Sequence, residues 1–535
     1  MAYLEQLAPI LILLTVVAVV IGRLPKIDLG HSDAFRRRRV LNWLPLGLTY
    51  AFLYMGRYNV KVSKLKLGDL TDAEGLPLMS NADFATIFGY GTLVYGMSFV
   101  LNGPMTDRIG GKRAILIGAG GALTANAAMG LCTQLVLGDR DGWLANNLTL
   151  MFSLLYAANM YFQSFGAVAI VKVNAPWFHV RERGVFGAIF GVLISLGIYF
   201  AFDWGKLILD HVGLTWVFYV PAILLALFFG IVTVFVRNTP GEAGHVDFDT
   251  ADASSGDDGE RLPVKDIFLM MLRNPIIVTI AFVEFCSGFL RQAIMQWYRE
   301  FAKQTDGTLD LAGSFVYDNW GLLLCCAGIL GGVVAGVISD RLFDSRRGPV
   351  AALLYGVMLV GAVVLLFAYQ EPFVGWLVIL MSMAVIGVHG MLSGTASMDF
   401  GGKKNVGIAV GIIDGFVYLG SGIMMAVYGV VLPTEEFDQA GKLTGAVTDP
   451  ANWRPWPISM IIVGILGTLL ATRVWNAKPK GKEVKPGIGT EVEDVPGGEG
   501  KGKDEDAESK DAESKGAEAD DAKAGGDADA DAAKS

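Results

Sequence analysis

Thirteen long apolar segments, joined by short polar connections, run through this chain of 535 residues. About 20 helical residues cross the hydrocarbon core of a bilayer, so each segment is predicted to be a transmembrane helix. Only 18% of the residues are charged, which excludes a single water-soluble core. The candidate spans lie near 4–24, 41–62, 83–105, 114–137, 147–171, 184–206, 214–236, 274–298, 317–339, 349–370, 374–398, 406–432 and 456–476.

The formal net charge of -9 belongs to two hydrophilic segments. Of the 52 acidic residues, 17 lie in 477–535 and 8 in 238–266. The apolar body is therefore not acidic, and nothing in it indicates a nucleic-acid partner. The tail 477–535 has few aromatic or branched side chains and is predicted to be disordered. It is either an interaction tail, whose protein partner the sequence does not reveal, or a dispensable solvated extension.

Basic residues predict the orientation in the cell (inner) membrane. Arginines at 36–39, and cations near 107–113, 181–183, 340–347 and 403–404, mark the cytoplasmic loops by the positive-inside rule. The C-terminus is then cytoplasmic. Segment 4–24 could be a signal peptide, but it lacks a cationic start and a small-residue cleavage site. We expect an extra N-terminal helix within 1–35, with its N-terminus outside.

The remaining twelve spans are duplicated in register. Arg39 and Arg273 lie 234 residues apart, as do Arg57 and Arg291, and the Asp107-Arg108 and Asp340-Arg341 pairs lie 233 apart. This predicts two six-helix halves, 36–237 and 274–476, joined by a cytoplasmic linker at 238–273. Repeats of this kind place a substrate site near the bilayer midplane, between the halves.

Arg57 and Arg291 are the candidate binding residues. Each follows the last cytoplasmic arginine before its helix by 18 residues, or about 27 Å of helix, which is near mid-depth of the membrane. An arginine there costs about 2.5–3.5 kcal/mol. Two guanidinium groups facing one cavity would suit the oxygens of an anion such as phosphate. Alternatively, each arginine pairs internally with Glu284 or Asp414.

Signs of catalysis or metal binding are missing from the sequence. The four cysteines lie in apolar stretches, and the five histidines have no ligand spacing. We therefore expect no enzyme activity, cofactor or metal.

The chain resembles the organophosphate:phosphate antiporters of the major facilitator superfamily over about 36–476. The motifs that carry the resemblance are Tyr54-Met-Gly-Arg57-Tyr-Asn59, Asn102-Gly-Pro-Met-Thr-Asp107-Arg108-Ile-Gly110, Tyr161-Phe-Gln163, Pro176-Trp-Phe178, Glu182-Arg183-Gly184, Phe289-Leu-Arg291, Gln296-Trp297, Gly401-Gly-Lys403-Lys404-Asn405-Val-Gly407 and Tyr418-Leu-Gly420. The resemblance implies an all-α polytopic membrane protein with the superfamily fold, two six-helix halves with inverted repeats, here preceded by the extra helix. It also implies that Arg57 and Arg291 bind a phosphate group.

Three positions depart from the family pattern. Phe99 stands where many members have lysine, Ile194 where the glycerol-phosphate branch has histidine, and Gly288 where a tyrosine precedes the second arginine. The sugar or polyol phosphate therefore stays open. Lys61 and Lys64, on the helical face of Arg57, either replace lost positive charge near the outer mouth or are interfacial lysines that snorkel.

Tyr54 and Gln163 are expected to line the substrate cavity, although a helix-to-helix hydrogen bond would also explain Gln163. Glu284 or Asp414 is expected to tune substrate choice or coupling. Asp107, Arg108, Asp340 and Arg341 are expected to form a cytoplasmic conformational latch. The predicted function is exchange of a small organic phosphate for inorganic phosphate. A proton-coupled organic-anion symporter and a transporter-like receptor for an organic phosphate are the alternatives.

Overall fold

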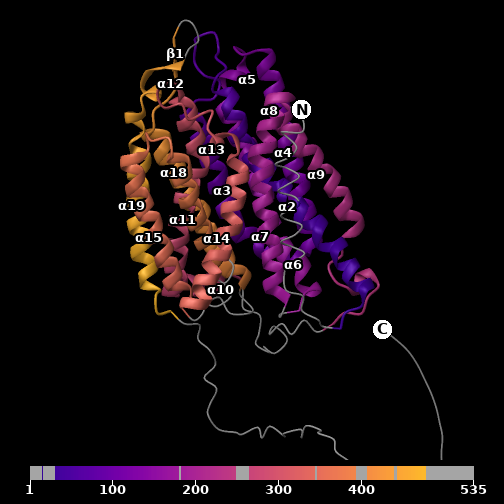
Figure 1. Ribbon diagram of the computed structural model, residues 1–535. Coiled ribbons are helices and arrows are strands. Elements are labelled where there is room, and N and C mark those ends of the chain that lie inside the picture. The colour runs from indigo at the N-terminus through magenta and orange to yellow at the C-terminus, as the bar shows by residue number, and fades with distance from the viewer. Residues whose placement is uncertain are drawn as a thin grey trace, which may run out of the picture. The chain divides into compact units, whose positions relative to one another are not determined.

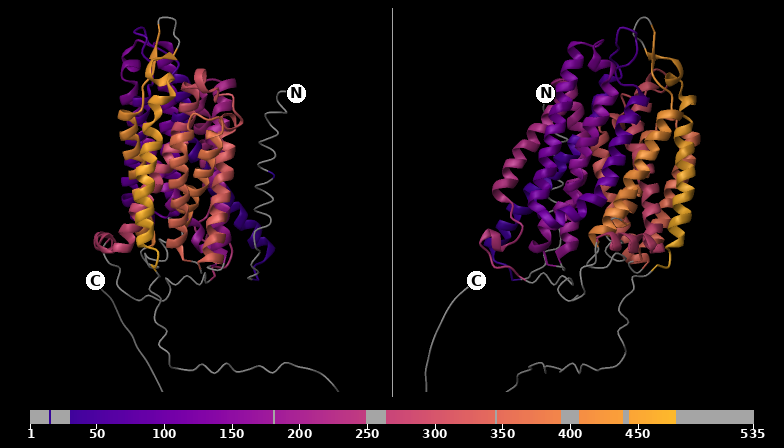
Figure 2. Two further views of the ribbon diagram at one scale, coloured as in Figure 1. Left: turned by 60° about the vertical axis from the view of Figure 1, so that its left-hand side comes forward. Right: turned by 180° about the vertical axis from the view of Figure 1, so that it is seen from behind.

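A computed structural model describes residue 15 and the ranges 30–179, 182–248, 264–343, 346–392, 406–438 and 443–477. Long helices form a bundle in two sets (Figures 1 and 2). The first set comprises α2 (Asp33–Leu67), α3 (Asn81–Ile109), α4 (Gly111–Gly138), α5 (Trp143–Asn146), α6 (Leu148–Asn174), α7 (Arg183–Tyr199), a π-helical turn (Phe200–Trp204), α8 (Gly205–His211) and α9 (Trp216–Phe235).

The second set follows the linker. It comprises α10 (Val264–Arg273), α11 (Pro275–Gln304), α12 (Asp306–Leu309), α13 (Phe315–Asp318), α14 (Trp320–Leu342), α15 (Arg347–Ala368), α16 (Val374–Met391), α18 (Val406–Val431) and α19 (Pro455–Arg473). Between α18 and α19, β1 (Glu436–Phe437) pairs antiparallel with β2 (Leu443–Thr444). In Figure 1 the first set is indigo to magenta and the second is mostly orange to yellow.

Eleven of the thirteen expected spans are confirmed as helices long and apolar enough to cross a membrane. The expected span 41–62 lies within α2, a 35-residue helix that carries Arg57, Lys61 and Lys64 and falls outside those eleven because of its composition. Segment 4–24 lies outside the described residues, apart from Thr15. The tail beyond 477 also lies outside them.

Two pairs of helices join the sets. Within the first set, α6 packs on α3 and α4, and α2 packs on α7 and α9. Within the second set, α11 packs on α18 and α19, and α15 packs on α16 and α19. Between the sets, α3 packs on α18 and α7 packs on α14. In each pair the second span of one half packs on the fifth span of the other, so the two contacts are equivalent in the duplicated order.

Asp203 makes a polar contact between the sets. It lies in the π-helical turn after α7, and its carboxylate accepts hydrogen bonds of 2.7 Å from the backbone N–H groups of Gly321 and Leu322. These groups lie in the first turn of α14, where a helix has unpaired donors and attracts negative charge. The first set thus caps a helix of the second.

Glycines let α11 and α18 approach to backbone contact. A Cβ added at Gly288 would lie 1.9 Å from the carbonyl oxygen of Val417, and one at Gly420 would lie 2.0 Å from that of Phe285. Both obstacles are backbone atoms that no rotamer change can move. The absence of the family's tyrosine at position 288 therefore has a packing reason in this chain.

We predict that Gly288→Ala destabilises the protein by about 1–3 kcal/mol, because the added methyl group forces the two backbones apart. The matched control is Gly332→Ala in α14, where no atom lies within 4 Å of the added Cβ. Alanine is the better helix former there, so the control should be neutral or slightly stabilising. Thermal unfolding in detergent measures both, and equal melting temperatures for the two variants would contradict the packing argument.

Candidate functional site

Arg57 lies near the middle of the bundle with 1% of its surface exposed. Its guanidinium group donates three hydrogen bonds: Nε to Gln163 Oε1 at 3.0 Å, Nη1 to the Tyr418 hydroxyl at 3.2 Å and Nη2 to the Tyr95 hydroxyl at 2.7 Å. All three acceptors are uncharged. The positive charge is therefore solvated by dipoles and neutralised by none of these partners.

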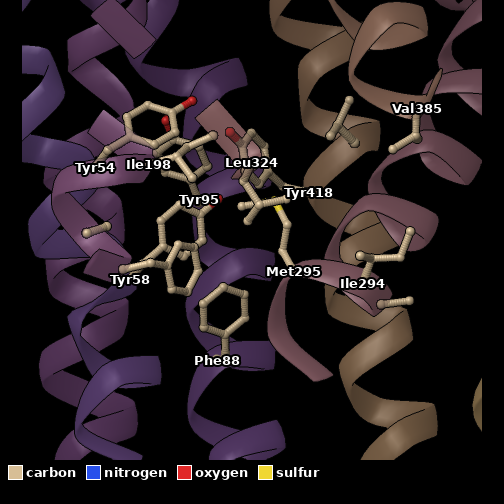
Figure 3. Packing of buried hydrophobic residues seen from close by; sticks show 14 of the residues in the cluster. Tyr54, Tyr58, Phe88, Tyr95, Ile198, Ile294, Met295, Leu324, Val385 and Tyr418 are labelled. Carbon is tan, nitrogen blue, oxygen red and sulfur yellow. The ribbon is translucent and has the colours of Figure 1, made fainter. Parts of the chain in front are cut away.

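Aromatic rings surround this charge. The guanidinium carbon lies 4.4 Å from the ring centre of Tyr54, 4.5 Å from that of Tyr95 and 5.9 Å from that of Tyr418. Cation–π attraction of this kind offsets part of the desolvation cost. Figure 3 shows these rings with Tyr58, gathered between helices of the first and second sets. Because Tyr418 belongs to α18, Arg57 binds both sets of helices.

A polar ladder on α6 holds Arg57 in place. The Gln163 amide donates to Asn159 Oδ1 at 3.0 Å, and the Asn159 amide donates to the backbone carbonyl of Gly56 at 2.8 Å. The Tyr156 hydroxyl donates to the carbonyl of Arg57 itself at 3.0 Å. Gln163 thus makes a helix-to-helix hydrogen bond with Arg57, and its role in lining a substrate cavity stays a prediction. The sequence analysis missed Tyr156 and Asn159, although polar groups at i, i+3 and i+7 of an apolar helix were a usable signal.

Arg291 lies on α11 with 8% of its surface exposed. Its Nε has no hydrogen-bond partner within the described residues. Tyr54 and Tyr418 lie within electrostatic range of both guanidinium groups, so the two arginines share neighbours. The two arginines come from the equivalent helices α2 and α11, and a common substrate site for them stays a prediction.

Among the described residues, Glu284 lies within electrostatic range of Arg291 but forms no hydrogen bond or ion pair with it, so pairing of the arginines with Glu284 or Asp414 stays an open alternative. Glu284 instead lies 2.9 Å from Nδ1 of His389 on α16. Its other oxygen has no partner in the described part of the chain. The sequence analysis missed His389, because a single histidine in an apolar helix has no pattern that names its partner.

Asp414 is half-buried on α18 and lies within electrostatic range of Tyr50, one turn before Tyr54 on α2. Phe99 packs against the hydroxyl-bearing rings, 4.8 Å from Tyr95 and 5.9 Å from Tyr418 between ring centres. The site thus has an apolar wall at the position where family members have lysine.

Lys61 and Lys64 are fully buried and ion-paired, so the expectation of snorkelling interfacial lysines is wrong. Of the predicted latch, Arg108 and Arg341 are exposed in the last turns of α3 and α14. The side chains of Asp107 and Asp340 lie outside the described part of the structure. The latch therefore stays a prediction.

Within the described ranges, no three His, Cys, Asp or Glu side chains are grouped so as to hold a metal ion. The four cysteines are free thiols.

The Major Facilitator Superfamily profile matches residues 46–425. The chain is 24% identical over 475 residues to the glycerol-3-phosphate transporter of Bacillus subtilis (strain 168), covering 85% of this chain and 97% of that protein. It is 26% identical over 477 residues to the membrane sensor protein UhpC of Escherichia coli (strain K12), covering 85% and 95%. A probable hexose phosphate transport protein of Chlamydia pneumoniae is 25% identical, covering 73% and 82%. The resemblance to the organophosphate:phosphate antiporters is confirmed, at modest identity.

Solved structures share the fold. The crystal structure of the nucleoside transporter NupG aligns with a TM-score of 0.55 at 13% identity, covering 80% of this chain and 100% of that one. A bacterial homologue of the human lysosomal transporter Spinster, inward-facing and unoccupied, aligns with a TM-score of 0.55 at 13% identity, covering 83% and 98%. The superfamily fold expected from the sequence is thus confirmed, whereas the extra N-terminal helix is not tested.

We predict that Glu284 sets the preference of the site between singly and doubly charged anions. Seven residues separate Glu284 from Arg291, about 10 Å along α11, where one charge contributes about 1.6 kcal/mol at an effective dielectric of 20. Glu284→Gln should therefore shift relative affinity towards the doubly charged anion by about tenfold. His389→Gln keeps a hydrogen-bond donor beside the carboxylate and should change this preference less than Glu284→Gln does. Competition between anions in proteoliposomes measures both.

The matched control is Glu371→Gln, at an exposed glutamate after α15. It should leave the competition profile unchanged. If Glu284→Gln and His389→Gln gave the same profile as this control, the pair would be only a structural contact between α11 and α16.

Proposed function

Because the chain belongs to the Major Facilitator Superfamily, we propose that it exchanges a small organic phosphate, such as a sugar or polyol phosphate, for inorganic phosphate. The chain is a multi-pass membrane transport protein and not an enzyme. The organic phosphate substrate and its exchange for inorganic phosphate are proposed. The location of the chain in the inner membrane and its division into the halves 36–237 and 274–476 are also proposed.

The observation that carries the proposal is the state of the two arginines. Arg57 is desolvated, and its donors bond only to uncharged hydroxyl and amide oxygens. Arg291, which shares the neighbours Tyr54 and Tyr418 with it, has an unpartnered Nε within the described residues. A phosphate group would supply the missing negative charge. It would also accept the hydrogen bonds that Arg57 now donates to the hydroxyls of Tyr95 and Tyr418. A guanidinium group can donate two parallel hydrogen bonds to two phosphate oxygens. Neutral or cationic solutes do not offer such a pair of negatively charged oxygens.

The relatives support an organic phosphate as the substrate. Two of them are a glycerol-3-phosphate transporter and a probable hexose phosphate transport protein. Tyrosine hydroxyls, Gln163 and the Glu284–His389 pair could bind the hydroxyl groups of such a solute, while Phe99 limits the space beside Tyr95. Asp414 adds a negative charge on α18 that disfavours more highly charged substrates.

Exchange follows from the cost of an empty site. A carrier that closes around two desolvated guanidinium groups loses their water but keeps their repulsion, which would be about 2 kcal/mol for groups about 8 Å apart at a dielectric near 20. Each 1.4 kcal/mol slows the return of the empty carrier tenfold. A phosphate-loaded carrier avoids most of this cost and crosses in either direction. Rocking of the two helix sets about the site, with Asp107, Arg108, Asp340 and Arg341 as latch, would give alternating access.

We predict that Arg57→Lys and Arg291→Lys each reduce phosphate exchange at least tenfold. Lysine keeps the charge but loses the planar fork, so at least one phosphate contact of about 1.5–3 kcal/mol is lost. The assay is uptake of labelled phosphate into proteoliposomes preloaded with phosphate.

Arg140→Lys, at an exposed loop arginine, is the control and should exchange at the wild-type rate. Folding is checked by monodispersity and thermal unfolding in detergent. Wild-type rate and affinity in either site variant would require the two-arginine site to be abandoned.

A membrane receptor for an organic phosphate is the second candidate, since one relative at 26% identity is the membrane sensor protein UhpC. The same arginines would then bind ligand without moving it. Phosphate binding by calorimetry with no measurable exchange in proteoliposomes would favour the receptor, and exchange would favour the transporter.

A further inference from the structure

A second charged cluster lies between the helix sets, beyond Arg57 towards the C-terminal end of α2. Lys61 Nζ is 2.9 Å from Glu300 Oε1, and Lys64 Nζ is 3.7 Å from Glu300 Oε2. Lys64 also pairs with Glu435, four residues after α18 ends. The four side chains are at most 2% exposed. Both lysines belong to the first set of helices and both glutamates to the second, so each ion pair crosses the boundary.

Further polar contacts join the two helix sets at this end. The Gln304 amide donates to Asn81 Oδ1 at 3.2 Å and to Glu435 Oε1 at 2.8 Å, and the backbone N–H of Asn81 donates to Glu435 Oε2 at 2.7 Å. Lys303, next to Gln304 on α11, pairs with Asp69 of the first set at 2.7 Å. The bundle is thus sealed by polar contacts at this end, the one opposite the basic loops.

Lys61 and Lys64 form a row with the phosphate-binding arginine. They follow Arg57 at i+4 and i+7 on one face of α2, about 6 and 10 Å further along the helix. The row leads from the central site towards the sealed end. An anion that entered from this end would meet Lys64 and Lys61 before reaching Arg57.

Separation of the two helix sets would leave the lysines and the glutamates on opposite sides. Glu300 and Glu435 would stay with α11 and α18, while Lys61 and Lys64 would lie together on α2. Breaking buried ion pairs is costly unless new partners or water replace the old ones. Two adjacent ammonium groups without their carboxylates would form a strong anion-binding point.

We propose that Lys61 and Lys64 form an entry subsite for the phosphate group of solutes arriving from the outer side. The carboxylates of Glu300 and Glu435 occupy this subsite when this end is closed, and phosphate replaces them when it opens. The ligand named here rests on the proposed function. The subsite itself rests on the four buried charges and on their division between the two helix sets.

The transport test compares phosphate affinity from the two sides of the membrane in proteoliposomes of known orientation. Lys61→Gln/Lys64→Gln should raise KM for inorganic phosphate at least tenfold from the outer side and less than twofold from the inner side. This variant leaves two glutamates buried without their lysines, so it could misfold. A second variant, in which Glu300→Gln and Glu435→Gln are added, removes all four charges and should show the same one-sided rise.

The matched control is Lys206→Gln/Asp210→Asn, which removes an ion pair of 3.0 Å in α8 and the 3.8 Å contact of Lys206 with Asp318 of the second set, and leaves Lys61 and Lys64 in place. It should leave KM unchanged from both sides. An unchanged outer KM in the four-residue variant would overturn the proposal. An equal rise from both sides would also overturn it, because the lysines would then act on the central site.

A labelling test does not depend on transport. Lys64→Cys should react with a membrane-impermeant thiol reagent added from the outer side, and saturating inorganic phosphate should slow this reaction at least fivefold. The native cysteines, three of them buried, supply the background rate in the wild-type protein. No slowing by phosphate would overturn the subsite, whatever the exchange assay gives. If phosphate slowed the labelling reaction but the protein did not exchange phosphate in proteoliposomes, the proposed function would be contradicted and the subsite would be supported.

Discussion

Solvation of the Arg57 charge by neutral groups is the interaction on which the organisation of the bundle's centre depends. An arginine at this depth costs free energy, and the structure meets that cost with three uncharged acceptors and three aromatic rings. The acceptors come from α3, α6 and α18, so these helices must keep their positions relative to α2. The ladder from Gln163 through Asn159 to the carbonyl of Gly56 serves the same requirement.

Much of this arrangement could be predicted from the sequence because its signals are local. The length and apolarity of a segment predict a span, and eleven such helices are observed. Register between the two halves predicted that Arg57 and Arg291 are equivalent, and both are buried beside Tyr54 and Tyr418. Gln163 stood out because a polar side chain in an apolar helix needs a partner, and it accepts a hydrogen bond from Arg57.

The partners of buried charges could not be predicted. Lys61 and Glu300 are 239 residues apart, and Lys64 and Glu435 are 371 apart. No local pattern connects such positions, so the sequence left open whether the lysines replace lost positive charge near the outer mouth or snorkel at the membrane interface. Glu284 was expected to face the same cavity as Arg291 from its place two turns before it on one helix, and it lies within electrostatic range of Arg291, but its contact with His389 could not be predicted. The close backbone contact at Gly288 also could not be predicted, because it depends on how closely α18 approaches α11.

The capping of α14 by Asp203 has a consequence for the energetics of opening. Its carboxylate bonds to two backbone N–H groups that no helical carbonyl can satisfy. Separation of α7 from α14 would release one carboxylate and two amides, each of which must then bind water. Opening at this place is therefore a hydration step, coupled to the number of water molecules taken up. Solutes that lower water activity without touching the protein would favour the closed bundle, so osmotic stress can count the waters that enter.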